Sequence, residues 1–593
     1  MKTSQVSGSK FRPLNAIAVV GLLLASLWVY AGTVANEFVW DTVFYLQVHE
    51  QRIAQLNLEN FIWMLTSAEA FYWHPVTWWS WAADYKLYGG LDAGGFHLTN
   101  VVIHGLNSGL LFLLLLKVLG FTRNRLPVAE TITGQHAILP AFIAALVFAV
   151  HPQHVESVAW VAERKDLLCQ FFLLLALITY FDQHSQNRKA RWSGSGLTLV
   201  FFLLALMSKP MAVTFPLLLL LLDVYPLGRS RYYQPGTESA GPTPVTRLLW
   251  EKWPYILAAL LVAVATIAAS QGAITQVPVG IKLLNAFNSI VAYISKFLIP
   301  VSFTPHYPYF TTPAKGVELQ HFIPVIGFLA ISASVVVAWI KGHRGWLIGW
   351  LFYLVSLLPV LGLISAGTQG MADRFSYFPT LPFYLAIAIG VKKIGDRFSA
   401  SFQRMALIAG LGVVLLLGFK TANQVKVWRN ELTLFQSIID IYPDNYTARD
   451  NMGILLLRAG AYDAAIRQFN AIEQMPVDQT SMLSWRVIAH LETGNLDGAL
   501  RDLVQLKNYA EGHPRLRLDL DCYHYDLGWI HAQLGSPDRA VEQFLLLGPD
   551  SSLAYQASQW LDSIAAGEAE AAAVERAPAL PGYCPALFPQ NWR

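Results

Sequence analysis

The sequence predicts an all-α protein: a polytopic transmembrane helical domain of about 11 spans, followed by a water-soluble α-solenoid. Of the 593 residues, 54% are hydrophobic and only 14% are charged, whereas soluble proteins carry about 25% charged residues. The apolar runs stop near residue 420, and a motif recurs with a spacing of 34 residues after residue 443. The net charge of +3 gives no reason to expect nucleic acid as a partner.

The apolar runs predict the membrane spans, because each helix needs about 20 apolar residues to cross the bilayer core. Basic clusters in short loops mark the cytoplasmic side, which places the N-terminus inside and the C-terminus outside. The long outer segments are then 34–97 and 271–321, the second with an interfacial or re-entrant helix over 285–300. The transmembrane domain covers 1–420, and its spans are expected near 14–33, 98–119, 135–150, 166–181, 196–207, 210–222, 254–270, 322–340, 346–364, 378–391 and 404–420.

The tail repeats a short glycine-led motif. Gly460-Ala461-Tyr462-Asp463-Ala464-Ala465 recurs 34 residues later from Gly494, and a third copy starts at Gly535. This pattern resembles the tetratricopeptide repeat, a helix–turn–helix unit in which a small alanine allows close helix packing. We therefore expect a tetratricopeptide-repeat domain over 421–565, stacked as a partner-binding solenoid, and a poorly ordered tail over 566–593.

The predicted outer loops contain nearly all the unusual clusters of charged and aromatic residues. Asp41 lies where the first helix leaves the membrane, and an ionisable group at that depth is costly. A plain helix-terminal aspartate in the interface is the simpler alternative. Two histidines of the first loop, His74 and His97, are candidate ligands or hydrogen-bonded structural residues.

The segment from His151 to Asp166 carries seven ionisable side chains within 16 residues. Its histidines and carboxylates suit either a divalent metal, through Asp166, Glu156 and His154, or a proton relay. Ordinary salt bridging at a helix entrance is the competing interpretation.

Three cations, Arg164, Lys209 and Arg374, are candidates for holding a phosphate group at the outer membrane surface. Snorkelling or ordinary ion pairing remains the alternative. The sequence shows no Walker A or GxGxxG unit, so we expect no nucleotide cofactor, and an activated donor used on the outer face should be carried by a lipid.

Several stretches together resemble the membrane O-mannosyltransferases with tetratricopeptide repeats, and their bacterial relatives, within the C-type glycosyltransferase superfamily. The order is preserved over nearly the whole chain, and the matching stretches are 38–41, 95–104, 151–166, 300–308, 371–379 and 428–430. The resemblance implies transfer of a sugar from a polyprenyl-phosphate donor to an acceptor hydroxyl, usually with inversion. It also implies a bacterial inner-membrane protein with its repeats in the periplasm.

This chain departs from the family at two positions. The first outer loop of the family typically carries two adjacent carboxylates, whereas Thr42 follows Asp41 here. Pro210 stands after Lys209 where relatives are often acidic. A lone Asp41 remains our choice for the general base, and without a second carboxylate we do not expect metal binding by an adjacent pair at that point.

The resemblance and the outer clusters give a set of site hypotheses. A divalent cation, Mg²⁺ or Mn²⁺, at Asp166, Glu156 or His154 would share the phosphate with the cations. The partners expected are a polyprenyl-phosphate-linked sugar, membrane lipid, and a protein or glycan acceptor bound by the repeats. The lipid-phosphate and substrate-binding candidates are Arg164, Lys209, Arg374, Asp373, His74, His97 and Tyr377.

Two other functions fit the same sequence. A lipid-linked oligosaccharide ligase or polymerase also uses many spans and outer-face Arg and His. A non-catalytic scaffold would use the repeats to recruit partners and the spans only as an anchor. Convergence of residues 41, 156, 166 and 374 favours an enzyme, and their dispersal favours the scaffold.

Overall fold

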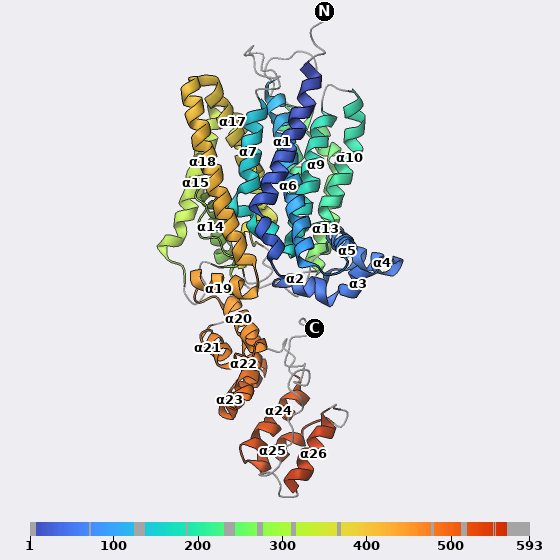
Figure 1. Cartoon of the computed structure of the whole chain (residues 1–593), viewed down its shortest axis with the longest axis vertical. Helices are drawn as coiled ribbons and strands as arrows, with labels where there is room; N and C mark the ends of the chain where they lie inside the picture. Colours follow the sequence, from blue (N-terminus) through green and yellow to red (C-terminus); the bar gives the residue numbers. More distant parts are fainter. Residues whose placement is uncertain are drawn as a thin grey trace, which may run out of the picture. The chain divides into compact units, whose positions relative to one another are not determined.

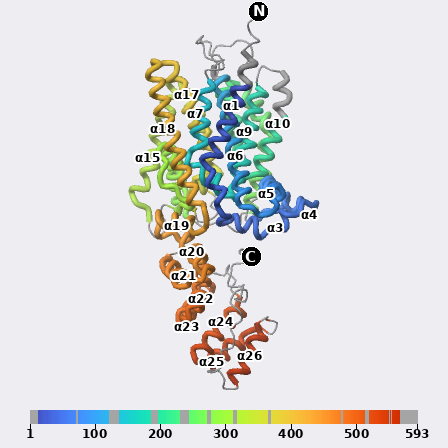
Figure 2. Tube along the Cα trace, in the orientation of Figure 1, coloured from blue at the N-terminus to red at the C-terminus, as the bar shows by residue number. Residues whose placement is uncertain are grey.

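The computed structural model consists of two compact units, residues 1–434 and 435–593 (Figures 1 and 2). The structure describes residues 7–69, 73–123, 137–184, 188–229, 243–269, 277–309, 316–363, 369–475, 479–511, 519–548, 551 and 553–565. The predicted poorly ordered tail, 566–593, lies outside these residues.

Unit 1 is a bundle of long, roughly parallel helices with shorter helices at one end (Figure 1). The helices that form it are α1 (Ser7–Val29), α2 (Asp41–Val43), α3 (Glu50–Ala54), α4 (Leu58–Thr66), α5 (Pro75–Tyr88), α6 (Ala93–Arg123), α7 (Ile138–Val150), α8 (Val155–Ala159), α9 (Arg164–Gln183), α10 (Arg188–Leu206), α11 (Phe215–Val224), α12 (Val245–Glu251), α13 (Trp253–Ala269), α14 (Val279–Leu298), α15 (Ile323–Ile340), α16 (Arg344–Leu357), α17 (Leu381–Arg397), α18 (Ala400–Val425) and the start of α19 (Glu431–Ile441).

Three helical stretches among the described residues are long and apolar enough to cross a membrane: Ala93–Gly120, Leu319–Ile340 and Ala400–Trp428. The number rises to five if the bent pairs α7 with α8 and α12 with α13 each count as one span. All eleven stretches predicted as spans contain helix, but several of those helices are short. The all-α, multi-pass membrane architecture is thus confirmed, and the count of about 11 stays a prediction.

Glycines bring α1 and α6 close together along their length. A Cβ atom added at Gly105 would lie 2.5 Å from the Leu23 side chain, and one at Gly109 would lie 2.9 Å from Val19. Small residues at a helix interface let the backbones approach, which is how helices associate where lipid surrounds them. This contact fixes α6, whose N-terminal half contributes to the buried polar region below.

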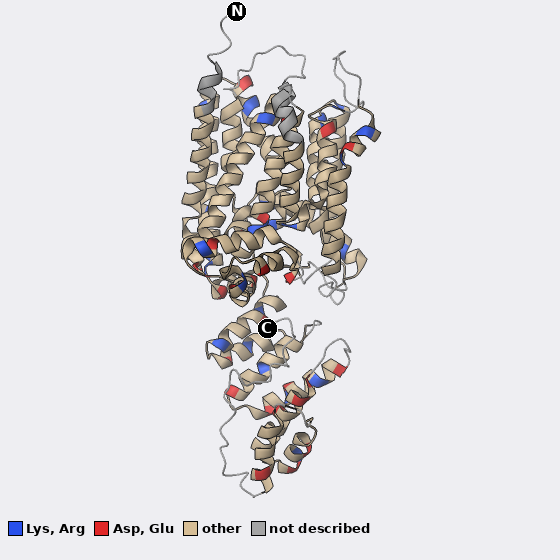
Figure 3. Cartoon of the chain, turned by 90° about the vertical axis from the view of Figure 1, so that its right-hand side faces the viewer, with Lys and Arg blue, Asp and Glu red and all other residues tan. Residues whose placement is uncertain are grey.

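Charged residues of unit 1 gather toward the two ends of the bundle, with an apolar band between them (Figure 3). At one end, a two-stranded antiparallel sheet pairs β1 (Tyr307–Pro308) with β2 (Gln369–Met371). The short helix η11 (Asp373–Ser376) follows β2 directly. The sheet therefore ties the loop after α14 to the segment that carries Asp373 and Arg374.

Unit 2 is built from helix pairs at the predicted repeat positions, which are spaced 34 residues apart for the first two copies and 41 for the third. The turn glycines Gly460, Gly494 and Gly535 share a left-handed backbone, with φ of 75°, 73° and 67°, a conformation that costs glycine little. The equivalent alanines Ala465, Ala499 and Ala540 are fully buried. The helices are α20 (Tyr446–Arg458), α21 (Tyr462–Asn470), α22 (Thr480–Glu492), α23 (Leu496–Glu511), α24 (Leu520–Gln533), α25 (Pro537–Phe544) and α26 (Ala554–Ala565).

Candidate active site

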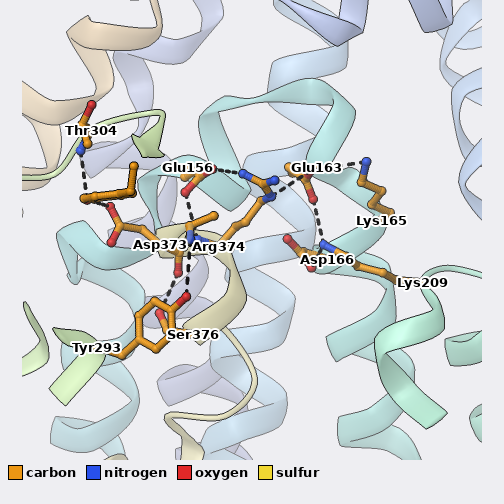
Figure 4. A network of polar contacts seen from close by, with 12 residues as sticks. Glu156, Glu163, Lys165, Asp166, Lys209, Tyr293, Thr304, Asp373, Arg374 and Ser376 are labelled. Atoms are coloured by element: carbon orange, nitrogen blue, oxygen red, sulfur yellow. Dashed lines mark hydrogen bonds and ion pairs between the residues drawn. The ribbon is translucent and has the colours of Figure 1, made fainter. Parts of the chain in front are cut away.

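A buried network of acids and bases connects several segments of unit 1 (Figure 4). Arg374 forms ion pairs with Glu156 and with Glu163, the second at 3.2 Å. Lys209 Nζ lies 3.0 Å from Glu163 and 2.6 Å from Asp166. Lys165 Nζ lies 3.3 Å from Glu163. Three cations and three carboxylates thus form one connected set, which we call the Arg374 network: Arg374, Lys209, Lys165, Glu156, Glu163 and Asp166.

Separate turns of the chain deliver the members of this network. Glu156 lies on α8, and Glu163 ends the short helix η6 (Val161–Glu163) just before α9 begins. Lys209 stands at the tip between α10 and η7 (Pro210–Thr214), the hairpin that the sequence predicts. Backbone contacts hold that tip against α5, since Val76 N donates to Met207 O at 3.1 Å.

Asp41 lies next to the network without being locked into it. Its charge is within interaction range of Lys165, Arg374 and Glu163. Its side chain is exposed to solvent, and among the described residues it has no hydrogen-bond or ion-pair partner. Protein atoms packed around the carboxylate nevertheless desolvate it and raise the pKa of Asp41, with Lys165 and Arg374 acting in the opposite direction. Because Asp41 keeps exposed surface and its pKa is raised, an incoming hydroxyl can reach it and pass it a proton.

Asp41 follows a strained residue. Trp40 has φ 54° and ψ −132°, a rare backbone conformation for a bulky side chain. Such strain persists only where the surroundings enforce it. The Trp40 indole stacks on Trp160 at 5.2 Å, and Trp160 stacks on Trp428 at 5.5 Å. The Arg374 guanidinium lies 5.3 Å from the Trp160 ring centroid, so this aromatic stack joins Asp41 to the network.

The surroundings of Thr42 favour an uncharged residue at this position, where the family typically has a second carboxylate. Its side chain is buried, and Oγ1 accepts a hydrogen bond from Ala162 N at 3.2 Å. A charged group there would be buried beside Glu163, the residue after Ala162. Position 42 therefore orients the turn that carries Glu163.

The cations and burial act on the carboxylates unequally. Burial acts to raise the pKa of Glu163, but Lys165, Lys209 and Arg374 together outweigh it and hold the pKa well below its ordinary value. Burial raises the pKa of Asp373 to about 7, although Lys296 opposes the shift. Tyr307 donates to Asp373 Oδ2 at 2.5 Å. Glu163 is thus fixed as an anion, whereas Asp373 holds its proton more readily.

The predicted metal ligands do not form a common site. Among the described residues, no group of three or more His, Cys, Asp or Glu is placed to hold a metal ion. Glu156 and Asp166 face Arg374 and Lys209, and His154 Nε2 instead contacts the Tyr384 hydroxyl at 2.7 Å. These residues do not fit a resident Mg²⁺ or Mn²⁺, because Glu156 and Asp166 are already paired with cations and His154 is turned toward a tyrosine hydroxyl.

Arg164 is not part of the Arg374 network, contrary to its expected role in phosphate binding. Its side chain has no exposed surface and pairs with Asp84 at 2.5 Å. Its Nε donates to Asn100 at 2.7 Å and its Nη2 to Phe96 O at 2.7 Å. Arg164 instead joins α5, α6 and α9, and the neighbouring Lys165 takes the place expected for it.

Three other predicted residues lie in packed surroundings. His74 is buried and stacks on Trp78 at 5.6 Å. His97 is buried, with Nε2 3.3 Å from Glu37 O. Tyr377 is buried, and its hydroxyl lies 2.7 Å from His104 Nδ1. These contacts favour structural roles for all three, in line with the simpler alternative for the histidines.

Two network members were not selected from the sequence. Glu163 contacts all three cations, and Lys165 completes the set. Both belong to the ionisable cluster at 151–166, so a signal existed. Sequence spacing alone does not show which charges of such a cluster turn inward together.

Comparison with known proteins shows a distant relation over most of the chain. The chain is 23% identical to Protein O-mannosyl-transferase Tmtc3 of Drosophila melanogaster, over 74% of this chain and 51% of that protein. It is 22% identical to Protein O-mannosyl-transferase TMTC3 of Homo sapiens, over 76% and 50%. For Protein O-mannosyl-transferase Tmtc1 of Drosophila melanogaster the identity is 25%, over 69% and 55%.

The chain spans about half the length of the curated relatives that it matches. No protein-family model matches it. The relation therefore supports distant kinship with membrane O-mannosyltransferases.

Proposed function

We propose that this chain is a membrane glycosyltransferase that moves a sugar from a polyprenyl-phosphate donor to an acceptor hydroxyl on a protein or glycan. One observation carries the proposal: Asp41 is an exposed carboxylate with no hydrogen-bond or ion-pair partner among the described residues, and it lies beside the buried cations Arg374 and Lys165. The distant relation to proteins named O-mannosyl-transferases supports the same reaction class.

The chemistry follows from what each group can do. The acceptor oxygen attacks the anomeric carbon, the bond from that carbon to the phosphate oxygen breaks, and the hydroxyl proton passes to Asp41. A raised pKa makes Asp41 a stronger base. The leaving phosphate needs positive charge more than a proton, and Arg374, Lys209 and Lys165 supply it.

The cations must first exchange partners. Each of them faces a carboxylate of the network. A bound phosphate would therefore replace a carboxylate as the partner of Arg374 or Lys209. Arg374 suits this exchange, since a guanidinium offers several donors in a planar fork.

The placement in the membrane is part of the proposal. We propose about 11 spans with the N-terminus in the cytosol, so that the Arg374 network and Asp41 lie on the periplasmic face of a bacterial inner membrane. Unit 2 would act there as a tetratricopeptide-repeat solenoid that binds the acceptor.

The test is to incubate the purified full-length chain with a panel of lipid-linked sugars. Polyprenyl-phosphate mannose comes first, because the relatives are named O-mannosyl-transferases. Release of free polyprenyl phosphate with an acceptor present supports the proposal. Consumption only of diphosphate-linked oligosaccharides would indicate a ligase or polymerase, and no consumption of any donor would favour a scaffold.

A further inference from the structure

A polar pocket lies between the loop after α14 and the last turns of α18. Its volume is about 370 Å³, and its lining consists of Pro152, Pro300, Val301, Ser302, Phe303, Lys420, Asn423 and Gln424. The lining includes one cation and no carboxylate. Such a pocket favours an anion, which the lysine and the two side-chain amides can contact.

The walls of the pocket are held in place by specific hydrogen bonds. Lys420 Nζ donates to Pro300 O at 3.1 Å, and Gln424 Nε2 donates to Phe303 O at 3.5 Å. Thr421 Oγ1 donates to Val150 O at 2.7 Å and so fixes α18 against the end of α7. The Lys420 ammonium group is thus held in place by one hydrogen bond, and its remaining N–H groups can donate to a ligand.

The loop wall is strained. Ser302 has φ 57°, a left-handed conformation that is uncommon for serine. Lys296 Nζ donates to Ser302 O at 2.6 Å and helps to enforce it. Strain of this kind tends to persist at ligand-binding positions.

Exposed apolar residues border the pocket. Leu298 and Ile299, directly before the lining loop, are 70% and 67% exposed, and Phe419, directly before Lys420, is 67% exposed. The stretch Ala400–Trp428 is one of the candidate membrane spans, and only 17% of its apolar window is buried. A ligand with one anionic group and an apolar chain matches a cationic pocket beside such a surface.

We propose that this pocket binds the phosphate group of a membrane lipid. The pocket is distinct from the Arg374 network but adjoins it through the loop. Lys296, which holds Ser302, lies 4.7 Å from the Tyr307 ring centroid, and Tyr307 is hydrogen-bonded to Asp373 next to Arg374. Two lipids carry this group: a polyprenyl phosphate, or a bilayer phospholipid such as phosphatidylglycerol.

The experiment measures lipid binding by the delipidated full-length chain, using native mass spectrometry. One arm adds a short-chain polyprenyl monophosphate, and the other adds phosphatidylglycerol. Lys420→Gln should weaken binding about tenfold or more, as expected when a charge-assisted hydrogen bond is lost. Lys393→Gln, which removes an exposed lysine of α17, should leave binding unchanged.

Asn423→Trp is the second pocket variant. Asn423 is exposed, so the indole can fill the pocket mouth without altering its charge. Weakened binding of either lipid in both pocket variants supports the proposal, and the lipid affected identifies the source of the phosphate. Unchanged binding of both lipids in a folded variant overturns it. The assay needs no sugar transfer, so its failure is distinct from failure of the proposed function.

Discussion

The Arg374 guanidinium pairs with two carboxylates: its Nε lies 3.2 Å from the carboxylate of Glu163, and it also pairs with Glu156, which lies earlier in the chain. One side chain from η11 therefore joins α8 to η6. Because an unpaired charge in a buried site is costly, these pairs hold the segment between β2 and α17 against the turn that leads into α9.

Breaking the Arg374–Glu156 pair should destabilise unit 1. Arg374→Gln leaves two buried carboxylates with less positive charge, a loss of about 3–5 kcal/mol for a buried pair. The double variant with Glu156→Gln should recover part of that loss, with a coupling energy above about 1 kcal/mol. The measurement is the unfolding free energy of the four variants of the cycle in detergent.

The exposed pair Lys392–Asp396 provides the control for this cycle. Its side chains are 25% and 50% exposed, so Asp396→Asn should change stability by less than about 1 kcal/mol. Equal effects at the buried and the exposed pair would argue against a structural role for the Arg374 network.

We predict that the Thr42 hydroxyl stabilises the fold through its hydrogen bond with Ala162 N. Thr42→Val removes the acceptor for Ala162 N and leaves a buried donor unpaired, at a cost of about 1–3 kcal/mol. Thr42→Ser keeps the oxygen and should stay close to the wild type. Thermal unfolding of the two variants compares them directly, and identical midpoints would mean that this hydrogen bond does not order the Glu163 turn.

Asp373 should make stability depend on pH. Burial raises its pKa to about 7, whereas the pKa of an aspartate in an unfolded chain is about 3.9. Between those values the folded chain holds a proton that the unfolded chain has lost. Stability should therefore fall as the pH rises through this window, by up to about 1.4 kcal/mol per pH unit.

Asp373→Asn removes this titration and should flatten the fall in stability between pH 5 and pH 7. Glu163 has the opposite sign, since its pKa is lowered, but its contribution is lost only below its ordinary pKa of 4.5. The measurement is the unfolding midpoint of the wild type and of Asp373→Asn at several pH values between pH 5 and pH 7. Equal slopes would exclude Asp373 as the titrating group.

Gly453 should be needed for close packing within unit 2. A Cβ atom there would lie 2.4 Å from the Phe469 ring. Gly453→Ala should destabilise the α20–α21 pair by about 1–3 kcal/mol, because overpacking forces side chains out of position. Hydrogen exchange of the α20 and α21 amides in the full chain measures the loss.

Two further variants separate packing from backbone effects. Phe469→Leu added to Gly453→Ala should restore part of the protection, because it removes the atoms in conflict. Gly412→Ala, where no atom lies within 4 Å of the added carbon, should have no such effect. An unprotected α20–α21 pair in the Gly412 variant would point to a cause other than packing.

The sequence predicted the elements better than their contacts. Each apolar run predicted as a span contains helix, but among the described residues only three stretches, or five with the bent pairs, are long and apolar enough to cross a membrane. The turn glycines Gly460 and Gly494 of unit 2 followed from their 34-residue spacing, and Gly535 from the recurrence of the motif 41 residues later. The two-stranded β1–β2 contact was missed, since strands of two or three residues leave no periodic pattern.

The candidate site was predictable as a region but not as a set of partners. The cluster at 151–166 indicated a metal site, a proton relay or salt bridges at the membrane surface, and the structure brings Glu156 and Asp166 to the cations Arg374 and Lys209. Spacing did not reveal that Arg164 turns toward Asp84 while Lys165 turns toward Glu163. That choice depends on which neighbouring segments supply a carboxylate, which only the tertiary structure decides.

The most direct test of the account compares donor consumption by the wild type, Asp41→Asn and Glu37→Gln, with polyprenyl-phosphate sugar and a saturating acceptor. Glu37 is an exposed carboxylate four residues earlier on the same segment, so its variant is the matched control. We predict that Asp41→Asn slows transfer by about 10²–10⁴-fold, the usual contribution of a general base, with unchanged folding and a Glu37→Gln rate like that of the wild type. A folded Asp41→Asn variant that transfers sugar at the wild-type rate would contradict the account.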